Sequence, residues 1–334
     1  MKRIALVPVL VTVLVLSLLL AACTPAPGAV STTGAGGEAQ ADTQAGGESL
    51  LIGYTASVTG KLNVESTRQT NGLNLWIEQV NAAGGIKLAD GSTFMTEAKF
   101  YDDESNNDRI QELYTKLATD DGANFLISPY SSGLAASASV IAEQYGKIMI
   151  TTGAASDSNY EQGYTLVYQA YTPASKYLTG AIDFLQKNAA DLKKIAIVHE
   201  NDKFSTDVST ALNDYATAAG YEIVMFEGYD SGTTDFAPFI NKIQEAAPDA
   251  ILGGGHFQDG STFARQLAEK SIAAPYVALL VAPPEPKFAE LGDASLGIIG
   301  PSQWEPQAAY SAAAAEELGL AWYGPSVQEF VEAY

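Results

Sequence analysis

Residues 194–226 read KIAIVHENDKFSTDVSTALNDYATAAGYEIVMF, and this stretch decides the fold. The apolar, β-branched run at 194–199 is typical of a strand, and residues 206–219 have the spacing of an amphipathic helix. The run at 222–226 is a second strand. A strand, a helix and a strand in this order predict a parallel sheet with the helix packed on one face.

The same alternation continues on both sides of this stretch. We expect further strands at 50–55, 95–101, 124–127, 147–151, 249–253, 276–280 and 297–300. We expect further helices at 68–81, 108–121, 133–145, 174–188, 235–246, 261–270 and 326–334. Strict alternation predicts an α/β protein with doubly wound parallel sheets and helices on both faces. The alternation of strands and helices begins again near Tyr171–Pro173, which predicts two lobes. We expect a ligand cleft where the carboxyl ends of the strands meet.

The N-terminal residues have the layout of a bacterial lipoprotein signal. Lys2 and Arg3 precede an uncharged apolar run at 4–20, and Leu20-Ala-Ala-Cys23 resembles a lipobox. The run is short for a membrane span and contains Pro8. We therefore expect residues 1–22 to be removed and Cys23 to be lipidated. The protein would then work outside the cytoplasm, tethered to a membrane.

Composition sets the domain limits. Residues 23–48 are rich in Ala, Gly, Thr and Ser, which predicts a flexible linker. We expect lobe 1 at 49–172, lobe 2 at 173–302, and a return to lobe 1 at 303–334. The last helix ends without a cap or a closing strand, so we expect a C-terminal part to be missing.

Charge and residue usage exclude several function classes. The net charge is −21 over 334 residues with no basic stripe, which argues against nucleic-acid binding. Cys23 is the only cysteine, so no disulfide is expected. Two histidines, His199 and His256, are too few for a His/Cys zinc site, and no G-x-S-x-G motif occurs. We predict no metal and no cofactor.

Two loops resemble nucleotide or calcium motifs only superficially. Between Gly53 and Gly60 there are six residues instead of the four of a phosphate loop, and Leu62 replaces its Ser or Thr. The acidic run from Asp102 lacks the glycine and the closing glutamate of a calcium loop. We interpret it as a solvated turn before a helix capped by Asp108.

Two serine-containing turns are suited to binding an anion. Ser131-Ser132-Gly133 lies where a strand ends and a helix begins, and backbone N–H groups at such a site favour a carboxylate. Ser131 or Ser132 could equally cap the helix that follows, and both roles are compatible. Residues 151–156, TTGAAS, form a second such turn after the next strand.

Several short segments, in the same order, resemble one family. They are Thr59-Gly60, Asn71-Gly72, VNAAGGI at 80–86, YDD at 101–103, IMI at 148–150 and IAIVH at 195–199. The chain from about Leu51 onward resembles the leucine/isoleucine/valine-binding type of periplasmic substrate-binding protein, which serves ABC importers. The resemblance implies a type I fold with two lobes joined by a hinge. It also implies a monomeric receptor without enzymatic activity whose partners are a small ligand and permease subunits.

The resemblance also implies a set of ligand-binding residues. The ligand's α-carboxylate would be held by the two turns, at Ser131, Ser132, Ala154, Ala155 and Ser156. Phe204 would close over the ligand from lobe 2, His256 takes the place of a second aromatic residue, and Glu65 is a further pocket position. Ordinary core packing is an equally simple interpretation of Phe204, Phe257 and Trp304.

One departure leaves the ligand's chemistry open. The family's amino-acid binders pair the ligand ammonium with lobe 2 carboxylates, and those positions fall near Ala174 and Leu280. A buried ammonium without a partner is costly. Either another carboxylate takes over, or the ligand is an amide or an acid that lacks an amino group. The carboxylates that could do so are Glu65, Asp202, Asp259 and Glu285.

The expected function is that of an extracytoplasmic solute-binding lipoprotein of an ABC importer. The ligand would be an amino acid, branched-chain or related, or an amide or carboxylate. Two alternatives remain. One is a sensory receptor with the same fold, coupled to signalling. The other is an exported hydrolase that uses Ser131 or Ser132 with His256.

Overall fold

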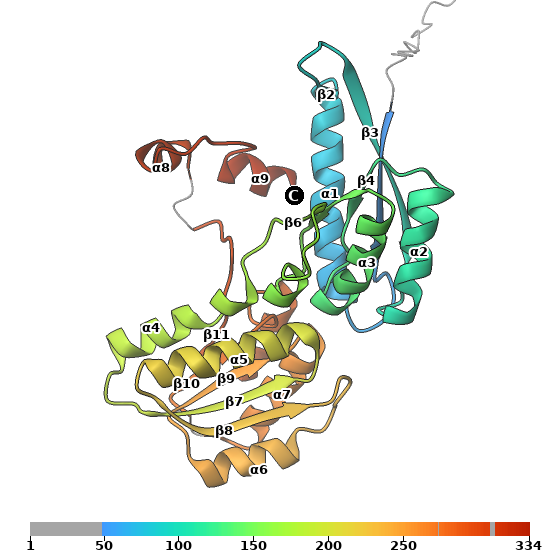
Figure 1. Ribbon diagram of the computed structural model, residues 1–334. Helices are drawn as coiled ribbons and strands as arrows, with labels where there is room; N and C mark the ends of the chain where they lie inside the picture. The colour runs from blue at the N-terminus through green and yellow to red at the C-terminus, as the bar shows by residue number, and fades with distance from the viewer. Residues whose placement is uncertain (1–48, 273, 308–310) are drawn as a thin grey trace, which may run out of the picture. The chain divides into compact units, whose positions relative to one another are not determined.

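The computed structural model describes residues 49–272, 274–307 and 311–334 (Figure 1). The signal peptide predicted at 1–22, the linker at 23–48 and Cys23 lie outside the described residues. Within the described part, none of the helices combines the length and the apolar character needed to span a bilayer.

Lobe 1, as we use the term, is built around a six-stranded sheet with the order β2-β3-β1-β4-β5-β6. Its strands are β1 (Ser49–Ala56), β2 (Ile86–Lys87), β3 (Thr93–Asp102), β4 (Phe125–Ile127), β5 (Ile148–Thr151) and β6 (Val167–Gln169). All neighbours are parallel except β2 and β3. The central strand β1 is buried from Ile52 onward because it has a neighbour on each side.

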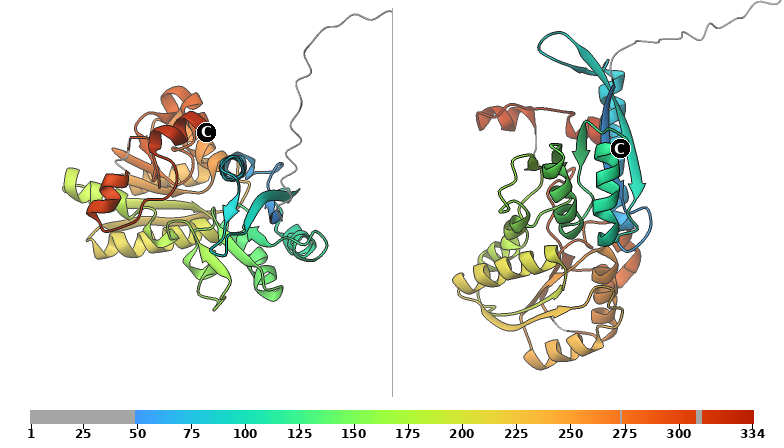
Figure 2. Two further views of the ribbon diagram at one scale, coloured as in Figure 1. Left: turned by 90° about the horizontal axis from the view of Figure 1, so that it is seen from above. Right: turned by 45° about the vertical axis from the view of Figure 1, so that its right-hand side comes forward.

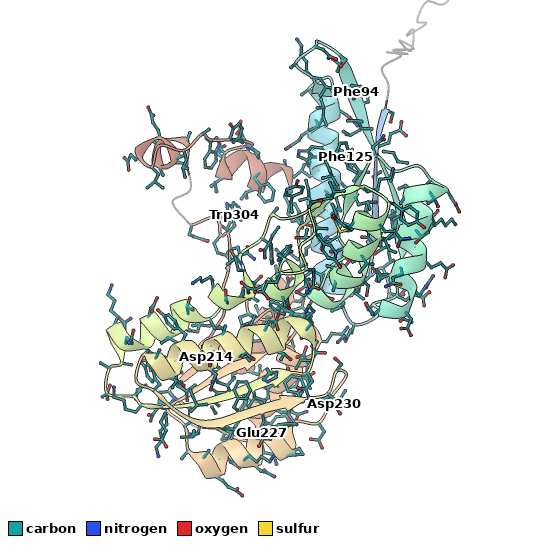
Figure 3. All side chains as sticks on the ribbon, in the orientation of Figure 1. Phe94, Phe125, Asp214, Glu227, Asp230 and Trp304 are labelled. Atoms are coloured by element: carbon teal, nitrogen blue, oxygen red, sulfur yellow. The ribbon has the colours of Figure 1, made fainter. Side chains whose placement is uncertain are left out.

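The helices of lobe 1 are α1 (Asn63–Ala82), α2 (Asn107–Thr119) and α3 (Ser132–Gln144), with a short 3-10 turn, η1, at Asp157–Asn159. Helices α2 and α3 bury one face of the sheet, where Ile110 and Leu134 pack with Leu126 and Met149. The opposite face of β4–β6 carries half-exposed apolar side chains such as Phe125, labelled in Figure 3.

Lobe 2 contains a five-stranded parallel sheet with the order β11-β10-β9-β7-β8. Its strands are β7 (Lys194–Glu200), β8 (Glu222–Tyr229), β9 (Ala250–Gly254), β10 (Tyr276–Leu279) and β11 (Ile298–Ile299). Its helical segments are η2 (Ala174–Lys176), α4 (Thr179–Asn188), α5 (Lys203–Ala218), α6 (Ala237–Ala246), α7 (Phe257–Glu269) and η3 (Pro286–Ser295).

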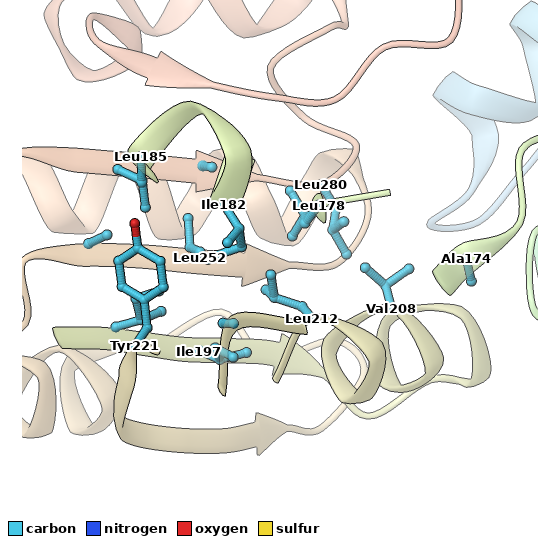
Figure 4. Close-up of a cluster of buried hydrophobic side chains, with 14 of the residues drawn as sticks. Ala174, Leu178, Ile182, Leu185, Ile197, Val208, Leu212, Tyr221, Leu252 and Leu280 are labelled. Atoms are coloured by element: carbon cyan, nitrogen blue, oxygen red, sulfur yellow. The ribbon is translucent and has the colours of Figure 1, made fainter. Parts of the chain in front are cut away.

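Strand β7 shows how the lobe 2 sheet is covered on both faces. Ile195 and Ile197 pack with α4 and α5 in the cluster of Figure 4, whereas Ala196 and Val198 pack with α6 and α7. Alternate residues of a strand point to opposite faces, so a strand buried on both faces is apolar throughout. This explains the continuous run IAIV that the sequence shows at this point.

The chain continues past β11 through α8 (Ala312–Glu317) and α9 (Val327–Ala333). Figures 1 and 2 show the C-terminus beside α1, where the Tyr334 hydroxyl donates a hydrogen bond to the Arg68 carbonyl at 3.4 Å. The ring of Trp304 packs edge-on against Phe330 of α9, with centroids 5.1 Å apart.

The expected α/β class with parallel sheets is confirmed, but some local predictions are wrong. Helix α1 begins at Asn63, five residues before the predicted start at 68. Asp108 does not cap α2; Asn106 does, because its side chain accepts a hydrogen bond from the Asp108 N–H at 2.9 Å. The helix predicted at 174–188 is interrupted, because Leu178 leaves the helical conformation between η2 and α4.

Strand β2 and its hairpin with β3 were not expected from the sequence. Gly84 and Gly85 follow the end of α1 and turn the chain back, with φ of +94° and +90°. A Cβ on Gly85 would lie 2.4 Å from the Phe94 carbonyl oxygen. Only glycine therefore permits this close approach of α1's end to β3.

Candidate functional site

A cavity of about 790 Å³ has walls from both lobes. From lobe 1, its wall includes Glu65, Arg68, Gln69, Tyr130 and Thr152. From lobe 2 and the segment after it, its wall includes Tyr177, Leu280, Glu285 and Trp304. The volume suits a small organic ligand, and the mixture of aromatic and polar side chains is typical of such sites.

The Ser131-Ser132 turn is strained and fully bonded internally. Ser131 has φ of 83°, which is unfavourable for a residue with a Cβ, and its hydroxyl caps α3 by accepting from the Leu134 N–H at 3.4 Å. The Ser132 hydroxyl oxygen accepts from the N–H groups of Ala155 and Ser156, at 3.1 and 3.0 Å. Ser132 thus holds the two serine-containing turns together, as one buried unit of lobe 1.

The second turn reaches lobe 2. The Ser156 hydroxyl donates to the Lys203 carbonyl at 3.3 Å, at the start of α5. Two residues on, Ser158 donates to an Asp207 carboxylate oxygen at 2.9 Å and accepts from Lys203 Nζ at 2.6 Å. The predicted carboxylate turn is therefore also a contact between the lobes.

His256 lies at the centre of a buried cluster. It precedes α7 and is 2% exposed. Its Nε2 lies 3.0 Å from Asp202 Oδ2, and its Nδ1 lies 3.4 Å from the Tyr130 hydroxyl oxygen. Its ring centroid lies 5.7 Å from that of Tyr130 and 5.8 Å from that of Phe204. The structure thus brings Phe204 and His256 together, with Tyr130 of lobe 1 against them.

Carboxylates around His256 set its charge. Burial alone lowers its pKa, but the Asp202 carboxylate, with Glu65 and Glu200 farther away, raises that pKa to about 9. For Asp202, burial raises the pKa, and the His256 charge and hydrogen bond outweigh this and lower it to about 2. His256 and Asp202 therefore form a buried ion pair at neutral pH.

Asp259, another acidic residue near His256, has a raised pKa instead of a lowered one. Burial, together with the nearby Glu200, raises the pKa of Asp259 to about 6. Asp259 accepts a hydrogen bond from the Tyr229 hydroxyl and another from the His256 backbone N–H at 2.8 Å. Asp259 is thus partly protonated near neutral pH and anchors the first turn of α7.

Lys61 and Arg68 of lobe 1 form ion pairs with carboxylates of lobe 2. Lys61 Nζ, from the loop before α1, donates to a Glu200 carboxylate oxygen that also accepts from the Ser231 hydroxyl. Arg68 of α1 donates to Glu285 Oε2 at 2.8 Å. The Glu200 side chain is 2% exposed, so its charge is removed from water by this contact.

Glu65 also joins the lobes, through α1. Its Oε1 accepts from the Phe257 N–H at 2.8 Å, at the first turn of α7. Its Oε2 is buried and has no hydrogen-bond partner among the described residues. Gln69 Oε1 and Thr152 Oγ1 are likewise buried without partners, and all three residues line the cavity.

The sequence-predicted site residues divide into two groups. All are buried, but only Glu65 forms part of the cavity wall. The buried residues that do not line it are Ser131, Ser132, Ala154, Ala155, Ser156, Phe204 and His256. Ala174 is fully buried in the apolar cluster of α4 and α5, and Leu280 lines the cavity, so neither position offers a charge. Sequence reasoning missed Gln69, although its position four residues after Glu65 places both on one face of α1.

One group of side chains in the described ranges has the composition of a metal site. Ligand atoms of Glu200, Asp202 and His256 lie within 4.8 Å of one another. The Asp202–His256 pair uses two of those residues, and Lys61 neutralises the third. The geometry of the protein's own contacts therefore accounts for this cluster.

Comparison with known proteins establishes the family. The family model described as "Periplasmic binding protein" matches residues 49–334. The chain belongs to this family. The expected resemblance to its leucine/isoleucine/valine-binding type is confirmed, because curated relatives carry that name.

Two curated relatives show how far this sequence has diverged from named members of the family. A leucine-, isoleucine-, valine-, threonine- and alanine-binding protein of Pseudomonas aeruginosa is 25% identical over 252 residues, which cover 75% of this chain and 66% of the relative. A Leu/Ile/Val-binding protein homolog 8 of Brucella abortus is 27% identical over 227 residues, covering 66% of this chain and 55% of the relative. This periplasmic binding protein thus spans about 55–66% of the length of these relatives.

Solved structures share the fold. The branched-chain amino acid transporter substrate binding protein LivJ of Streptococcus pneumoniae, in complex with isoleucine, has a TM-score of 0.69 at 21% identity, over 81% of this chain and 76% of LivJ. A solute binding protein of R. palustris, in complex with 4-hydroxybenzoate, has a TM-score of 0.71 at 17% identity, over 86% and 73%. The type I fold of this periplasmic binding protein is confirmed by these likenesses.

Proposed function

We propose that this periplasmic binding protein is the solute receptor of an ABC importer. Its lobes would close about a hinge on a small solute in the cavity and present the closed form to permease subunits. The observation that carries the proposal is the cavity itself, which lies between the lobes and has walls from both. The contacts of Lys61 and Arg68 with lobe 2 are the kind of interaction that holds such lobes together.

The solute is an amino acid or a related carboxylate or amide. One curated relative is named for binding leucine, isoleucine, valine, threonine and alanine, and two solved neighbours hold isoleucine and 4-hydroxybenzoate. The carboxylate would be held beside the Ser131-Ser132 turn and residues 154–156, where the first-turn N–H groups of α3 favour an anion, because the N–H groups of Ala155 and Ser156 already donate to the Ser132 hydroxyl. The receptor would act outside the cytoplasm as a monomer.

The lipid anchor is part of the same proposal. Cys23 follows the lipobox-like sequence and would carry the lipid. Replacing Cys23 by alanine should move the protein from the membrane fraction to the soluble fraction. Retention of the variant in membranes would contradict anchoring through this residue.

A thermal-shift screen of the full-length protein in detergent tests the binding function. A ligand that binds only the folded state at a hundred times its Kd stabilises it by about 2.7 kcal/mol, which raises Tm measurably. We expect a shift with at least one amino acid, carboxylate or amide, and a smaller radius of gyration in X-ray scattering with that ligand. No shift across the panel would refute the proposal.

The two alternatives have weaker support. A sensory receptor would share the cavity. It would be distinguished by its gene neighbours, which would encode signalling proteins instead of a permease and an ATPase. A serine hydrolase needs a histidine bonded to its nucleophile. Here His256 contacts Tyr130 and Asp202, and the Ser131 and Ser132 hydroxyls accept from backbone N–H groups.

A further inference from the structure

A buried histidine lies where the two lobes meet. His256 precedes α7 in lobe 2, and its side chain is almost fully buried. Its Nδ1 faces lobe 1, at 3.4 Å from the Tyr130 hydroxyl oxygen and 3.9 Å from Glu65 Oε1. Its Nε2 faces lobe 2, at 3.0 Å from Asp202 Oδ2 and 3.9 Å from Glu200 Oε2. One imidazole ring therefore stands between carboxylates of the two lobes.

The other described neighbours of the ring do not replace its charge. Phe204, from α5, is apolar and packs with its ring centroid 5.8 Å away. Asp259, on α7, is a further acidic group and accepts from the His256 backbone N–H at 2.8 Å. Lys61 brings a positive charge to this junction, but it donates to Glu200 Oε1. The Lys61 charge is therefore paired with Glu200, and the remaining carboxylates depend on the imidazole.

The proton on His256 changes what faces lobe 1. In the protonated ring both nitrogens carry a hydrogen, so Nε2 can donate to Asp202 while Nδ1–H points toward Tyr130 and Glu65. In the neutral ring, with its one hydrogen kept at Nε2 by Asp202, Nδ1 is an acceptor. The Glu65 carboxylate of lobe 1 then faces a lone pair and the Asp202 charge. Buried charges of the same sign repel strongly, because water does not screen them.

Lobe closure and protonation are therefore linked. In the closed arrangement burial lowers the pKa of His256, but the charges of Asp202, Glu65 and Glu200 outweigh it and raise the pKa from 6.5 to about 9. In separated lobes Glu65 is withdrawn and the Asp202 pair meets water, where ion pairs are weak, so the pKa returns toward its ordinary value. A group with the higher pKa in the closed form favours closure fully below its open-form pKa. That contribution is lost as the pH rises through about 9.

We propose that the imidazolium of His256 is a latch between the lobes, which holds Glu65 and Tyr130 of lobe 1 and releases them when it loses its proton. The latch makes closure of the receptor depend on the pH of the surrounding medium. The inference rests on the proposed function only in requiring lobes that can separate. Its test uses no ligand, so its failure is distinguishable from a failure of solute binding.

Distances between spin labels on the full-length protein in detergent test the latch. The replacements Glu78→Cys on α1 and Asp214→Cys on α5 provide one exposed label site in each lobe. The labelled chain is measured as such and with Lys61→Met, which lacks the Lys61–Glu200 pair between the lobes. We expect the ratio of the short to the long distance to fall between pH 7 and 9, by up to about tenfold per pH unit. Distances that do not change with pH in either protein would overturn the latch.

Three variants, each in the labelled Lys61→Met chain, separate the latch from general effects of pH. In His256→Gln, whose side chain stays neutral, the long distance should predominate from pH 7 to 9. Glu65→Gln removes the lobe 1 charge but keeps an oxygen for the Phe257 N–H, so it should abolish the pH dependence. His199→Gln is the matched control, because His199 is buried within lobe 2 and bonds to the next residue's carbonyl.

The variants have opposite expected outcomes. His199→Gln should retain the pH dependence of the labelled chain, and its loss would assign the titration to His199 and overturn the latch. A folded Glu65→Gln protein whose distances still change with pH would overturn it as well. Glu65→Gln decides the question if His256→Gln does not fold, because it leaves the Asp202–His256 pair in place.

Discussion

His256 Nε2 and Asp202 Oδ2 lie 3.0 Å apart in the interior of the protein, joining the loop after β7 to the start of α7. The pKa of His256 is raised from 6.5 to about 9 despite its burial, because Asp202, Glu65 and Glu200 surround it. A group whose pKa is raised on folding stabilises the protein fully below its unfolded pKa. That contribution is lost as the pH rises from about 6.5 through 9.

We therefore expect the free energy of unfolding to fall by about 3 kcal/mol between pH 6.5 and 9.5. Urea titrations of the full-length protein at several pH values measure it. His256→Gln should lower stability at pH 6.5 and should flatten the dependence, because its side chain does not ionise. If the stability of His256→Gln depends on pH as steeply as that of the wild type, a group other than His256 causes the pH dependence.

Asp259→Asn should stabilise the protein at pH 7.5. Burial and the nearby Glu200 raise the pKa of Asp259 from 3.8 to about 6, so the stability that the neutral carboxyl provides is lost as the pH rises from 3.8 through 6. An asparagine stays neutral and can still accept from the His256 N–H. We expect a gain of about 1–3 kcal/mol at pH 7.5 and little at pH 4.

Asp249→Asn is the control for the Asp259 experiment. The N–H groups of Lys193 and Lys194 donate to Asp249 and lower its pKa, so this ionised carboxylate is stabilising instead. The two variants should therefore change stability in opposite directions at pH 7.5. The same sign for both would contradict the assigned protonation of Asp259.

Ser131→Gly and Ser131→Ala should change the stability of the protein in opposite directions. Ser131 has φ of 83°, where glycine is unstrained and alanine is not. Glycine at a helix N-cap costs only a few tenths of a kcal/mol relative to serine, whereas alanine costs about 1 kcal/mol. We expect the glycine variant to be about 1 kcal/mol more stable than wild type and the alanine variant about 1 kcal/mol less stable. Equal effects in urea titrations would contradict the strain at this turn.

The parts of the fold that follow from local pattern could be predicted. The apolar run at 194–199 indicated a strand, and the amphipathic segments beside it indicated the helices. Errors arose where close approach of distant segments decides the structure. The β2–β3 hairpin depends on the close approach of Gly85 to Phe94, and α2 is capped by Asn106, whose side chain accepts from the Asp108 N–H.

The site could be predicted only as a set of candidates. Glu65, Asp202, Asp259 and Glu285 were all identified as carboxylates that could meet the ligand, but their partners are far away in the chain. His256 is 54 residues from Asp202, and Phe257 is 192 residues from Glu65. Which carboxylate keeps a free oxygen depends on these long-range contacts, and no local pattern records them.

Leu212→Ala should be strongly destabilising. Leu212 lies on α5 with 2% exposure, in the cluster that joins α4 and α5 to the lobe 2 sheet. Truncation of a buried leucine costs about 2–5 kcal/mol through lost contacts and the remaining cavity. Leu296→Ala is the control, because Leu296 is 73% exposed and its truncation should cost less than about 0.5 kcal/mol. Similar midpoints for both variants would contradict the packing of this cluster.

Lys61→Met should weaken the contact between the lobes. Lys61 is partly exposed in lobe 1, but its partner Glu200 is almost fully buried in lobe 2. Without Lys61, the Glu200 charge has no cation at this contact and can be rehydrated only if the lobes separate. We expect a loss of about 1–3 kcal/mol in stability and a larger radius of gyration in X-ray scattering.

Two further variants test the cause of that change. Lys242→Met removes an exposed pair with Glu227 that lies within lobe 2, so it should cost less than about 1 kcal/mol and leave the scattering unchanged. Combining Lys61→Met with Glu200→Gln removes the uncompensated charge and should restore part of the stability. If Lys61→Met changes stability and scattering as little as Lys242→Met does, the Lys61–Glu200 pair is an ordinary surface contact. If the double variant is as unstable as Lys61→Met, the buried charge of Glu200 is not what separates the lobes.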